Sequence, residues 1–444
     1  MEQMEPNIDS GELILGKSCR PLTEEQRKEW ESLREYASKQ FAHDGQDSHM
    51  AIDYDLLLQQ GIKGISRSID EKLQGTEDME GRHSMEGKHS MEGRHSMEIP
   101  AGTEIVDAEG LQVYPGFVEA HGHIGLDGYG IGYEGMDYNE LNDIISPQMR
   151  GIDGVKPMDP ALPKAAAAGV TCVCVGPGSA NVLGGTFTTI KTVGKRVDDM
   201  VVRDGVAMKC AFGENPKRVY RDKKDSSRMT TAALLRETLF KAREYMEKKE
   251  AAGDDVSKRP AFDMKLEAMI PVMKKEIPLK AHAHAAEDLF TALRIAREFD
   301  LKITLEHVTE GHLIVEELAK ENVPLAVGPT LTSASKFELR NKSWITPGVL
   351  AAAGCQVSII TDSPVIPQEY LPLCAGLAVQ AGMDPFAALQ AITINPAKHA
   401  GIADRVGSLE VGKDADMVIT DGCPFEVSTK VKHVFIDGKR VCTE

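Results

Sequence analysis

The chain has 444 residues and a formal net charge of −17, from 51 lysines and arginines against 68 aspartates and glutamates. This acidity argues against nucleic acid or an anionic membrane as a partner, because both attract clustered cations. Hydrophobic residues form 42% of the sequence, enough for a large core. No apolar run approaches the ~18 residues of a membrane helix. Length and composition therefore favour one large globular fold with appendages.

Cysteine usage and the N-terminal residues bear on the compartment. The eight cysteines have no regular spacing, which is typical of reduced thiols in a cytoplasmic protein. The first residues, MEQMEPNIDSGEL, lack the basic and apolar regions of a secretory signal. We therefore expect a cytoplasmic protein whose partner is a small-molecule substrate, not nucleic acid or a membrane. Assembly into a homo-oligomer is left open.

Residues 1–97 form an atypical N-terminal segment with few aliphatic runs. A six-residue unit, Met-Glu-Gly-Arg/Lys-His-Ser, occurs three times, starting at Met79, Met85 and Met91. The glycine in each unit and the lack of aliphatic residues predict a linker, and whether the segment folds or is disordered is left open. The histidine of each unit suggests a metal-binding tract as the alternative. Six-residue spacing, however, suits no common face of a helix or strand.

From Glu98 onward, short apolar segments alternate with helical patterns. Helices are predicted at 231–248 and 287–299, where apolar residues recur every three or four positions. The predicted strands are 117–121, 171–175, 187–191, 206–211, 279–283, 302–306, 324–327 and 356–361. This alternation predicts an α/β fold, a (β/α)8 TIM-like barrel over residues 116–402. A doubly wound open sheet is the alternative, although no glycine-rich phosphate motif follows the first strand.

Two shorter regions predict a small flanking β-sandwich module. Candidate opening strands at 103–106 and 111–114 lie within residues 98–115. Residues 403–444 contain an alternating segment at 430–436, an Asp437-Gly438 turn and a last strand at 439–442. An Asp-Gly pair between two such segments is typical of a β-hairpin. We therefore expect the two regions to form one module beside the barrel.

Histidines stand at the carboxyl ends of several predicted strands. His121 and His123 end the first strand, His282 and His284 the fifth, and His307 the sixth. Asp362 follows the eighth. In a closed barrel these ends converge on one face, where substrates bind. A single histidine at a strand end is more often a packing residue, but the combination predicts a metal site.

The His-x-His spacing has a physical reason. Side chains at i and i+2 point to the same face of a strand, so His121 and His123 can bind one cation together. Imidazole suits zinc, iron or manganese, and a carboxylate adds a charged ligand. His121, His123, either His307 or His282, and Asp362 would leave a position for water, which becomes a nucleophile near neutral pH. Asp362 is the expected catalytic residue, accepting the proton of that water and returning it to a leaving nitrogen.

At these residues the sequence resembles the amidohydrolase superfamily, in its imidazolonepropionase-like and metal-dependent dipeptidase-like branch. Residues 113–123, VYPGFVEAHGH, are similar to the first motif of that superfamily, with Glu119 where aspartate is usual. Thr361-Asp362-Ser363-Pro364 resembles the eighth-strand motif, and residues 407–416, GSLEVGKDAD, resemble the segment that enters the β-module. The resemblance covers about residues 98–444.

The resemblance implies hydrolysis of a carbon–nitrogen bond other than a protein peptide bond. It implies a divalent metal, zinc first, as one ion or two. The implied metal ligands are His121, His123, His282, His307 and Asp362, with Lys209 as a carboxylated lysine bridging two ions. His284 would then contact the substrate. Arg218 is our candidate for binding a substrate carboxylate, and His312 is expected to contact substrate or to orient ligands.

Three functions follow from this reading. The first is hydrolysis of a small cyclic amide, an N-acyl compound or a dipeptide-like molecule. The second is deamination of an amino-heterocycle, which releases ammonia and no new carboxylate. The third is a non-catalytic scaffold whose N-terminal segment binds a partner. A scaffold has no need of four metal ligands, so the ligand set favours an enzyme.

Overall fold

The structure of the chain is a computed structural model that describes residues 105–127, 129, 132–222 and 226–443. It divides into two units, Met1–Gly110 and Leu111–Glu444. All described helices and strands belong to the second unit. The predicted linker and the rest of residues 1–97 lie outside the described residues, as do the first two residues of the strand predicted at 103–106.

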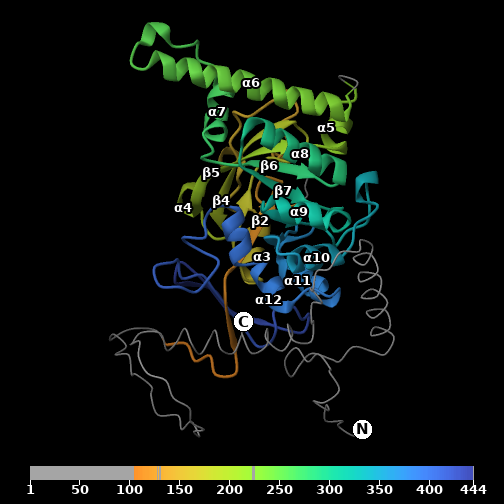
Figure 1. Cartoon of the computed structure of the whole chain (residues 1–444). Helices are drawn as coiled ribbons and strands as arrows, with labels where there is room; N and C mark the ends of the chain where they lie inside the picture. Colours follow the sequence, from red (N-terminus) through yellow and green to blue (C-terminus); the bar gives the residue numbers. More distant parts are fainter. Residues whose placement is uncertain (1–104, 128, 130–131, 223–225, 444) are drawn as a thin grey trace, which may run out of the picture. The chain divides into compact units, whose positions relative to one another are not determined.

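Eight strands, β2 to β9, form one sheet in chain order (Figure 1). They are β2 (Phe117–Gly122), β3 (Val170–Val175), β4 (Leu183–Lys191), β5 (Val201–Ala211), β6 (Leu279–Ala283), β7 (Ile303–His307), β8 (Leu325–Val327) and β9 (Val357–Ile359). Each overlaps a strand predicted from the sequence, and β9 lies beside β2. The fold is therefore α/β, with a nearly closed eight-stranded barrel, as predicted.

The third strand of the barrel departs from the expected alternation of strands and helices. β4 runs antiparallel to both β3 and β5, whereas the other neighbouring strands pair in parallel. Among the described residues, only the four-residue helix α4 (Val197–Met200) lies between β3 and β5 besides β4 itself. Antiparallel strands need only a short connection. The repeated strand–helix pattern predicted from the sequence is therefore wrong at β4.

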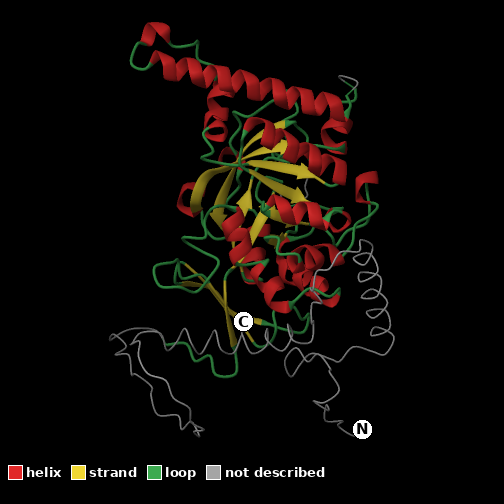
Figure 2. Cartoon of the chain, in the orientation of Figure 1, coloured by secondary structure: helices red, strands yellow, loops and turns green. Residues whose placement is uncertain are grey.

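Helices pack around the outside of the barrel strands (Figure 2). They are α3 (Ala161–Ala167), α5 (Glu214–Val219), α6 (Arg228–Ala252), α7 (Met264–Met273), α8 (Ala286–Phe299), α9 (Val315–Glu321), α10 (Ile345–Ala352), α11 (Leu371–Gln380), α12 (Pro385–Gln390) and α13 (Ile394–His399). The helices predicted at 231–248 and 287–299 are confirmed as α6 and α8. None of the described helices combines the length and the apolar character that crossing a membrane requires.

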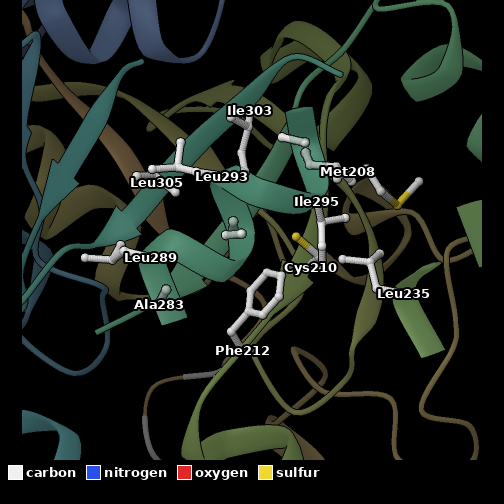
Figure 3. Close-up of a cluster of buried hydrophobic side chains, with 14 of the residues drawn as sticks. Met208, Cys210, Phe212, Leu235, Ala283, Leu289, Leu293, Ile295, Ile303 and Leu305 are labelled. Atoms are coloured by element: carbon white, nitrogen blue, oxygen red, sulfur yellow. The ribbon is translucent and has the colours of Figure 1, made fainter. Parts of the chain in front are cut away.

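The largest hydrophobic cluster lies between the barrel strands and the helices that cover them. Figure 3 shows Met208 of β5, Leu235 of α6, Leu293 of α8 and Leu305 of β7 gathered in it, and all four are buried. Burying aliphatic side chains of this size stabilises the fold by about 1.5–3 kcal/mol each. The cluster packs β5, β6 and β7, which carry Lys209, His282 and His307, against these helices.

Side-chain contacts hold the first and last strands of the barrel together. The Oε2 atom of Glu119 accepts hydrogen bonds from the backbone N–H of Thr361 (2.9 Å), its hydroxyl (2.6 Å) and the amide of Gln368 (2.9 Å). The backbone N–H of His123 donates to the carbonyl of Ser363 (2.6 Å). These contacts fix the chain on both sides of the predicted catalytic residue.

A four-stranded antiparallel sheet forms the flanking module. Its order is β1 (Gln112–Pro115), β10 (Met417–Thr420), β11 (Val431–Ile436) and β12 (Lys439–Thr443). The predicted C-terminal hairpin is confirmed as β11 and β12. Among the described residues the module is one sheet and not a two-layered sandwich, and residues 105 and 106 of the strand predicted at 103–106 form no strand.

We expect Lys191 to be a main link between the barrel and this module. Its buried Nζ lies 2.9 Å from carboxylate oxygens of Asp414 and Asp416 and 3.2 Å from Asp437. Lys191→Met leaves the buried carboxylate of Asp416 without its cation, so the free energy of unfolding should fall by about 3–5 kcal/mol in urea denaturation. The exposed Lys195 offers a matched control: Lys195→Met should change it by less than ~0.5 kcal/mol. Equal values for the two variants would contradict the link.

Candidate metal centre

The histidines predicted at strand ends and Asp362 lie together at the carboxyl ends of the barrel strands. Asp362 Oδ1 is 3.3 Å from His123 Nε2 and 3.8 Å from His121 Nε2. The ring centroids of His282 and His307 are 4.2 Å apart. Side chains from β2, β6, β7 and the segment after β9 therefore meet at one place, as the convergence of strand ends in a barrel requires.

A hydrogen bond at Nδ1 fixes three of these rings. The acceptors are the Gly176 carbonyl for His123 (2.8 Å), the Gly328 carbonyl for His307 (2.9 Å) and the Glu306 carboxylate for His121 (3.0 Å). A proton held at Nδ1 leaves the Nε2 lone pair of each ring available. Histidines that bind metal are oriented in this way by partners behind the ring.

Several buried polar atoms at this place have no hydrogen-bond partner among the described residues. They are both ring nitrogens of His282, Nε2 of His307 and Oδ1 of Asp362. Leaving such atoms unpaired is costly, and a cation would use all of these lone pairs. Ligand atoms of His121, His307 and Asp362 lie within 4.8 Å of one another, as do those of His282, His284 and His307. The donor set therefore fits one or two divalent cations of the kind that imidazole and carboxylate bind.

Burial sets the protonation states of this cluster. Desolvation holds the pKa values of His121, His282 and His284 well below the usual range and lowers that of His307 to about 4. Burial opposes ionisation of Asp362, but the neighbouring histidines outweigh it and keep its pKa below the usual range. Neutral imidazoles and an ionised carboxylate are the forms that bind metal.

The backbone at two of these residues adopts a left-handed conformation. His307 has φ 76° and Asp362 has φ 54°. This region is uncommon for residues other than glycine, although histidine and aspartate enter it more readily than most. Such conformations are held in place by the surrounding structure and cluster at functional sites.

Lys209 reaches the same cluster from β5. Its Nζ lies 3.0 Å from His121 Nε2, and its side chain is fully buried. Burial lowers the pKa of Lys209 to about 8, against the opposing attraction of Asp362 and Glu306. The amine is therefore more readily deprotonated than an ordinary lysine, which a carbamate requires. Carboxylation of Lys209 stays a prediction.

Sequence reasoning missed the charged residues behind the histidines. Glu306 of β7 bonds His121 through Oε2 and His399 through Oε1 (2.8 Å), and Lys280 Nζ lies 3.0 Å from Oε2. Burial opposes ionisation of Glu306, but His399, Lys280 and His121 hold its pKa well below the usual range. The alternation of Lys280 and His282 on one strand face was a signal that could have predicted part of this network.

We expect Glu306→Gln to weaken metal binding. The amide keeps the shape of the side chain but removes the charge that orients His121 and balances Lys280. Loss of such a partner costs about 10–100-fold in metal affinity, measurable by competition with a chromophoric chelator. Glu310→Gln is the control, because the buried carboxylate of Glu310 accepts bonds from the N–H of Ala286 and from Asn341 instead. Unchanged affinity in Glu306→Gln would contradict the role of this carboxylate.

Two predicted substrate-binding residues do not join the cluster. Arg218 lies exposed on α5, and His312, in the short 3-10 helix Gly311–Leu313, bonds Thr346 of α10 through Nδ1 (2.9 Å). The third, His284, does join it: its ring stacks on His307 with centroids 4.6 Å apart. Its Nδ1 atom bonds the Thr309 hydroxyl (2.7 Å), and its Nε2 atom lies 3.3 Å from Nζ of Lys336.

Comparisons with known proteins agree with this architecture. Amidohydrolase tasK of Hapsidospora irregularis is 29% identical over 369 residues, which cover 77% of this chain and 37% of that protein. The chain thus spans little more than a third of that relative. An imidazolonepropionase of Symbiobacterium thermophilum is 27% identical over 358 residues, 71% of this chain and 76% of that protein.

A solved structure and a family model extend the comparison. The crystal structure of an amidohydrolase from Thermotoga maritima is 41% identical, with a TM-score of 0.76 over 80% of this chain and 93% of that one. The model of the amidohydrolase family matches residues 112–441, from β1 of the flanking sheet to its last strand. The resemblance seen in the sequence motifs is confirmed, and the chain belongs to the amidohydrolase family.

Proposed function

We propose that the chain is a divalent-metal-dependent hydrolase that cleaves a carbon–nitrogen bond in a small amide. The observation that carries the proposal is the convergence of His121, His123 and His307, each fixed at Nδ1, with Asp362. His282 adds a fourth imidazole whose nitrogens have no hydrogen-bond partner among the described residues. Zinc is the proposed metal, because neutral imidazoles and one carboxylate are its usual ligands.

The residues of the site would have two roles, metal binding and proton transfer. His121, His123, His307, His282 and Asp362 would hold the cation. When bound, it supplies Lewis-acid polarisation of the substrate carbonyl and makes water acidic enough to attack near neutral pH. Asp362 stays ionised because the surrounding histidines keep its pKa low. Its carboxylate can therefore take up the proton of the attacking water and pass it to the departing nitrogen.

The proposed substrate is a cyclic amide, an N-acyl compound or a dipeptide-like molecule. Family membership supports chemistry at a carbon–nitrogen bond, and the match to an imidazolonepropionase over most of this chain favours an amide over an amino-heterocycle. Deamination is the second candidate, since it uses the same attack on a carbon bearing nitrogen. It would release ammonia without producing a carboxylate.

Metal analysis and a substrate panel test the proposal. We expect the purified full chain to contain zinc or another divalent metal. We also expect it to hydrolyse members of a panel of N-acyl amino acids, dipeptides and cyclic ureides to a new carboxylate. Removal of the metal with a chelator should abolish the activity, and adding zinc should restore it. A full chain that neither contains nor takes up a divalent metal would refute the proposal, and ammonia as the product would favour deamination.

A further inference from the structure

A lysine and a glutamate lie beside the histidine cluster, in the segment between β8 and α10. Lys336 Nζ is 3.3 Å from Nε2 of His284, and it donates hydrogen bonds to Glu338 Oε1 (2.8 Å) and Asn215 Oδ1 (3.1 Å). The Lys336 side chain is 13% exposed, whereas that of Glu338 is 1% exposed. An ammonium group therefore stands at the edge of the candidate metal centre, in contact with both protein and solvent.

The position of this ammonium is fixed by two separate segments of the chain. Glu338 Oε2 accepts a hydrogen bond from the N–H of Glu214 (2.9 Å), and the N–H of Glu338 donates to Glu214 Oε1 (3.2 Å). Asn215 is held in turn by the hydroxyl of Ser179 (2.6 Å). Both acceptors of Lys336 are thus anchored, so its side chain is preorganised and loses little conformational freedom when a ligand binds.

In the absence of an anionic ligand, the positive charge of Lys336 disfavours binding of a metal cation to the histidine cluster. The ammonium lies 3.3 Å from Nε2 of His284, whose ring stacks on that of His307. A metal cation bound by these rings would be repelled by the ammonium, because the two charges have the same sign. An anionic ligand between Lys336 and the metal would remove this conflict, because it attracts both cations. If Lys336 served only to neutralise the carboxylate of Glu338, its ammonium would not need to lie beside the histidines.

We infer that Lys336 binds a carboxylate of the substrate, placed next to the bond that is cleaved. This inference rests on the proposed function and narrows its substrate class to molecules with a free carboxylate, such as N-acyl amino acids and dipeptides. Lysine has three N–H donors; Glu338 and Asn215 take two, and the third points to His284 Nε2 (3.3 Å), a contact that a carboxylate bound beside the cluster would replace. Glu338 is a positioning residue that holds the ammonium, and His284 lies where the bound substrate would pass.

Matched acids and amides test the inference with the metal-loaded full chain. The probes are N-acetyl amino acids and dipeptides, each paired with its C-terminal amide, which keeps the scissile bond and removes the charge. We expect the parent protein to prefer each acid. Lys336→Met should lower the acid-to-amide ratio of kcat/KM by about 30-fold or more, because it removes the partner of a desolvated carboxylate. Most of the loss should fall in KM, and Lys336→Arg should restore much of the preference.

Further variants separate recognition from folding. Lys336→Met leaves Glu338 without its cation. The double variant Lys336→Met, Glu338→Gln removes both charges and should show the same loss of preference. Lys342→Met is the control, because Lys342 lies in the same segment but donates to the Thr332 hydroxyl (2.7 Å). The control should keep the parental ratio. Thermal unfolding of each variant shows whether it is folded.

Calorimetric titration with N-acetyl amino acids and their amides separates the inference from the proposed function. Hydrolysis of acids and amides at equal rates by both parent and Lys336→Met would overturn the inference and leave the hydrolase standing. Acids that bind the parent but not Lys336→Met, without any hydrolysis, would support the carboxylate site and count against the hydrolase. A parent protein that neither binds nor hydrolyses any acid of the panel would overturn the inference.

Discussion

Asp362→Asn should lower kcat for amide hydrolysis by about 10³-fold, within the range that a lost general acid–base group produces. The amide cannot accept the proton of the attacking water, and it removes the negative charge that lies 3.3 Å from His123 Nε2. Asparagine tolerates the left-handed backbone at this position (φ 54°). The variant therefore tests the carboxylate and leaves the local fold unchanged. Steady-state kinetics against the best substrate of the panel would measure the effect.

Two controls, metal content and a variant at an exposed aspartate, show whether a lower kcat of Asp362→Asn comes from loss of the proton acceptor. Metal content separates loss of the proton acceptor from loss of the ion, because the amide oxygen of asparagine can still serve as a ligand. Asp384→Asn alters an exposed helix N-cap on α12, whose Oδ1 accepts from the N–H of Ala387, and should keep the parental rate. An Asp362→Asn protein that retains metal and more than about a tenth of the parental kcat would exclude Asp362 as the proton acceptor.

Hydrophobic periodicity was enough to locate the barrel strands but not to orient them. Each of the eight predicted segments overlaps a strand of the sheet, because buried strands need contiguous apolar residues whichever way they run. The direction of β4 depends on its connections to β3 and β5, which are too short for the crossover that parallel pairing requires. β4 and β5 begin before the strands predicted at 187–191 and 206–211, so the predicted gaps are longer than the connections in the structure.

The candidate site likewise contains residues that could be predicted from the sequence and residues that could not. His121, His123, His282, His307 and Asp362 could be predicted because each stands at a strand end, and a barrel brings strand ends together. His399 comes from α13, and its bond to Glu306 depends on how that helix packs against the barrel. Helix packing of this kind leaves no signal in the local spacing of residues. Glu338 lies in the short 3-10 helix Phe337–Leu339, which Lys336 precedes, and a single turn of helix has no periodicity from which the direction of a side chain could be predicted.

Arg218 was predicted from the sequence but lies outside the cluster. A cation after a strand was a reasonable candidate for binding a substrate carboxylate, yet Arg218 lies exposed on α5. Lys336, which is far from it in the sequence, contacts His284 instead. Asn215 of the same helix is one of the two acceptors that hold Lys336. The predicted segment thus contributes to the candidate site through a neutral side chain that positions a cation from another loop.

Lys209→Ala should reduce kcat/KM by about 10³-fold if Lys209 carries a carbamate that bridges two ions, since metal activation and orientation of the water would both be lost. With a pKa of about 8, roughly a tenth of the Lys209 side chains are unprotonated at pH 7, against less than about one in a thousand for an ordinary lysine. Burial thus favours reaction of the amine with carbon dioxide. Metal reconstitution should accordingly become faster when bicarbonate is added.

Chemical rescue distinguishes a carbamate from a lysine that merely fills space. Removing the side chain leaves room beside His121 Nε2, which lies 3.0 Å from Nζ in the parent. A short carboxylate such as propionate can occupy that room and supply the two oxygens of the carbamate, so it should restore part of the activity of Lys209→Ala. Lys209→Arg keeps the charge but cannot form a carbamate and should not be rescued. If Lys209→Arg is as active as the parent, Lys209 acts through its charge alone and no carbamate bridges the ions.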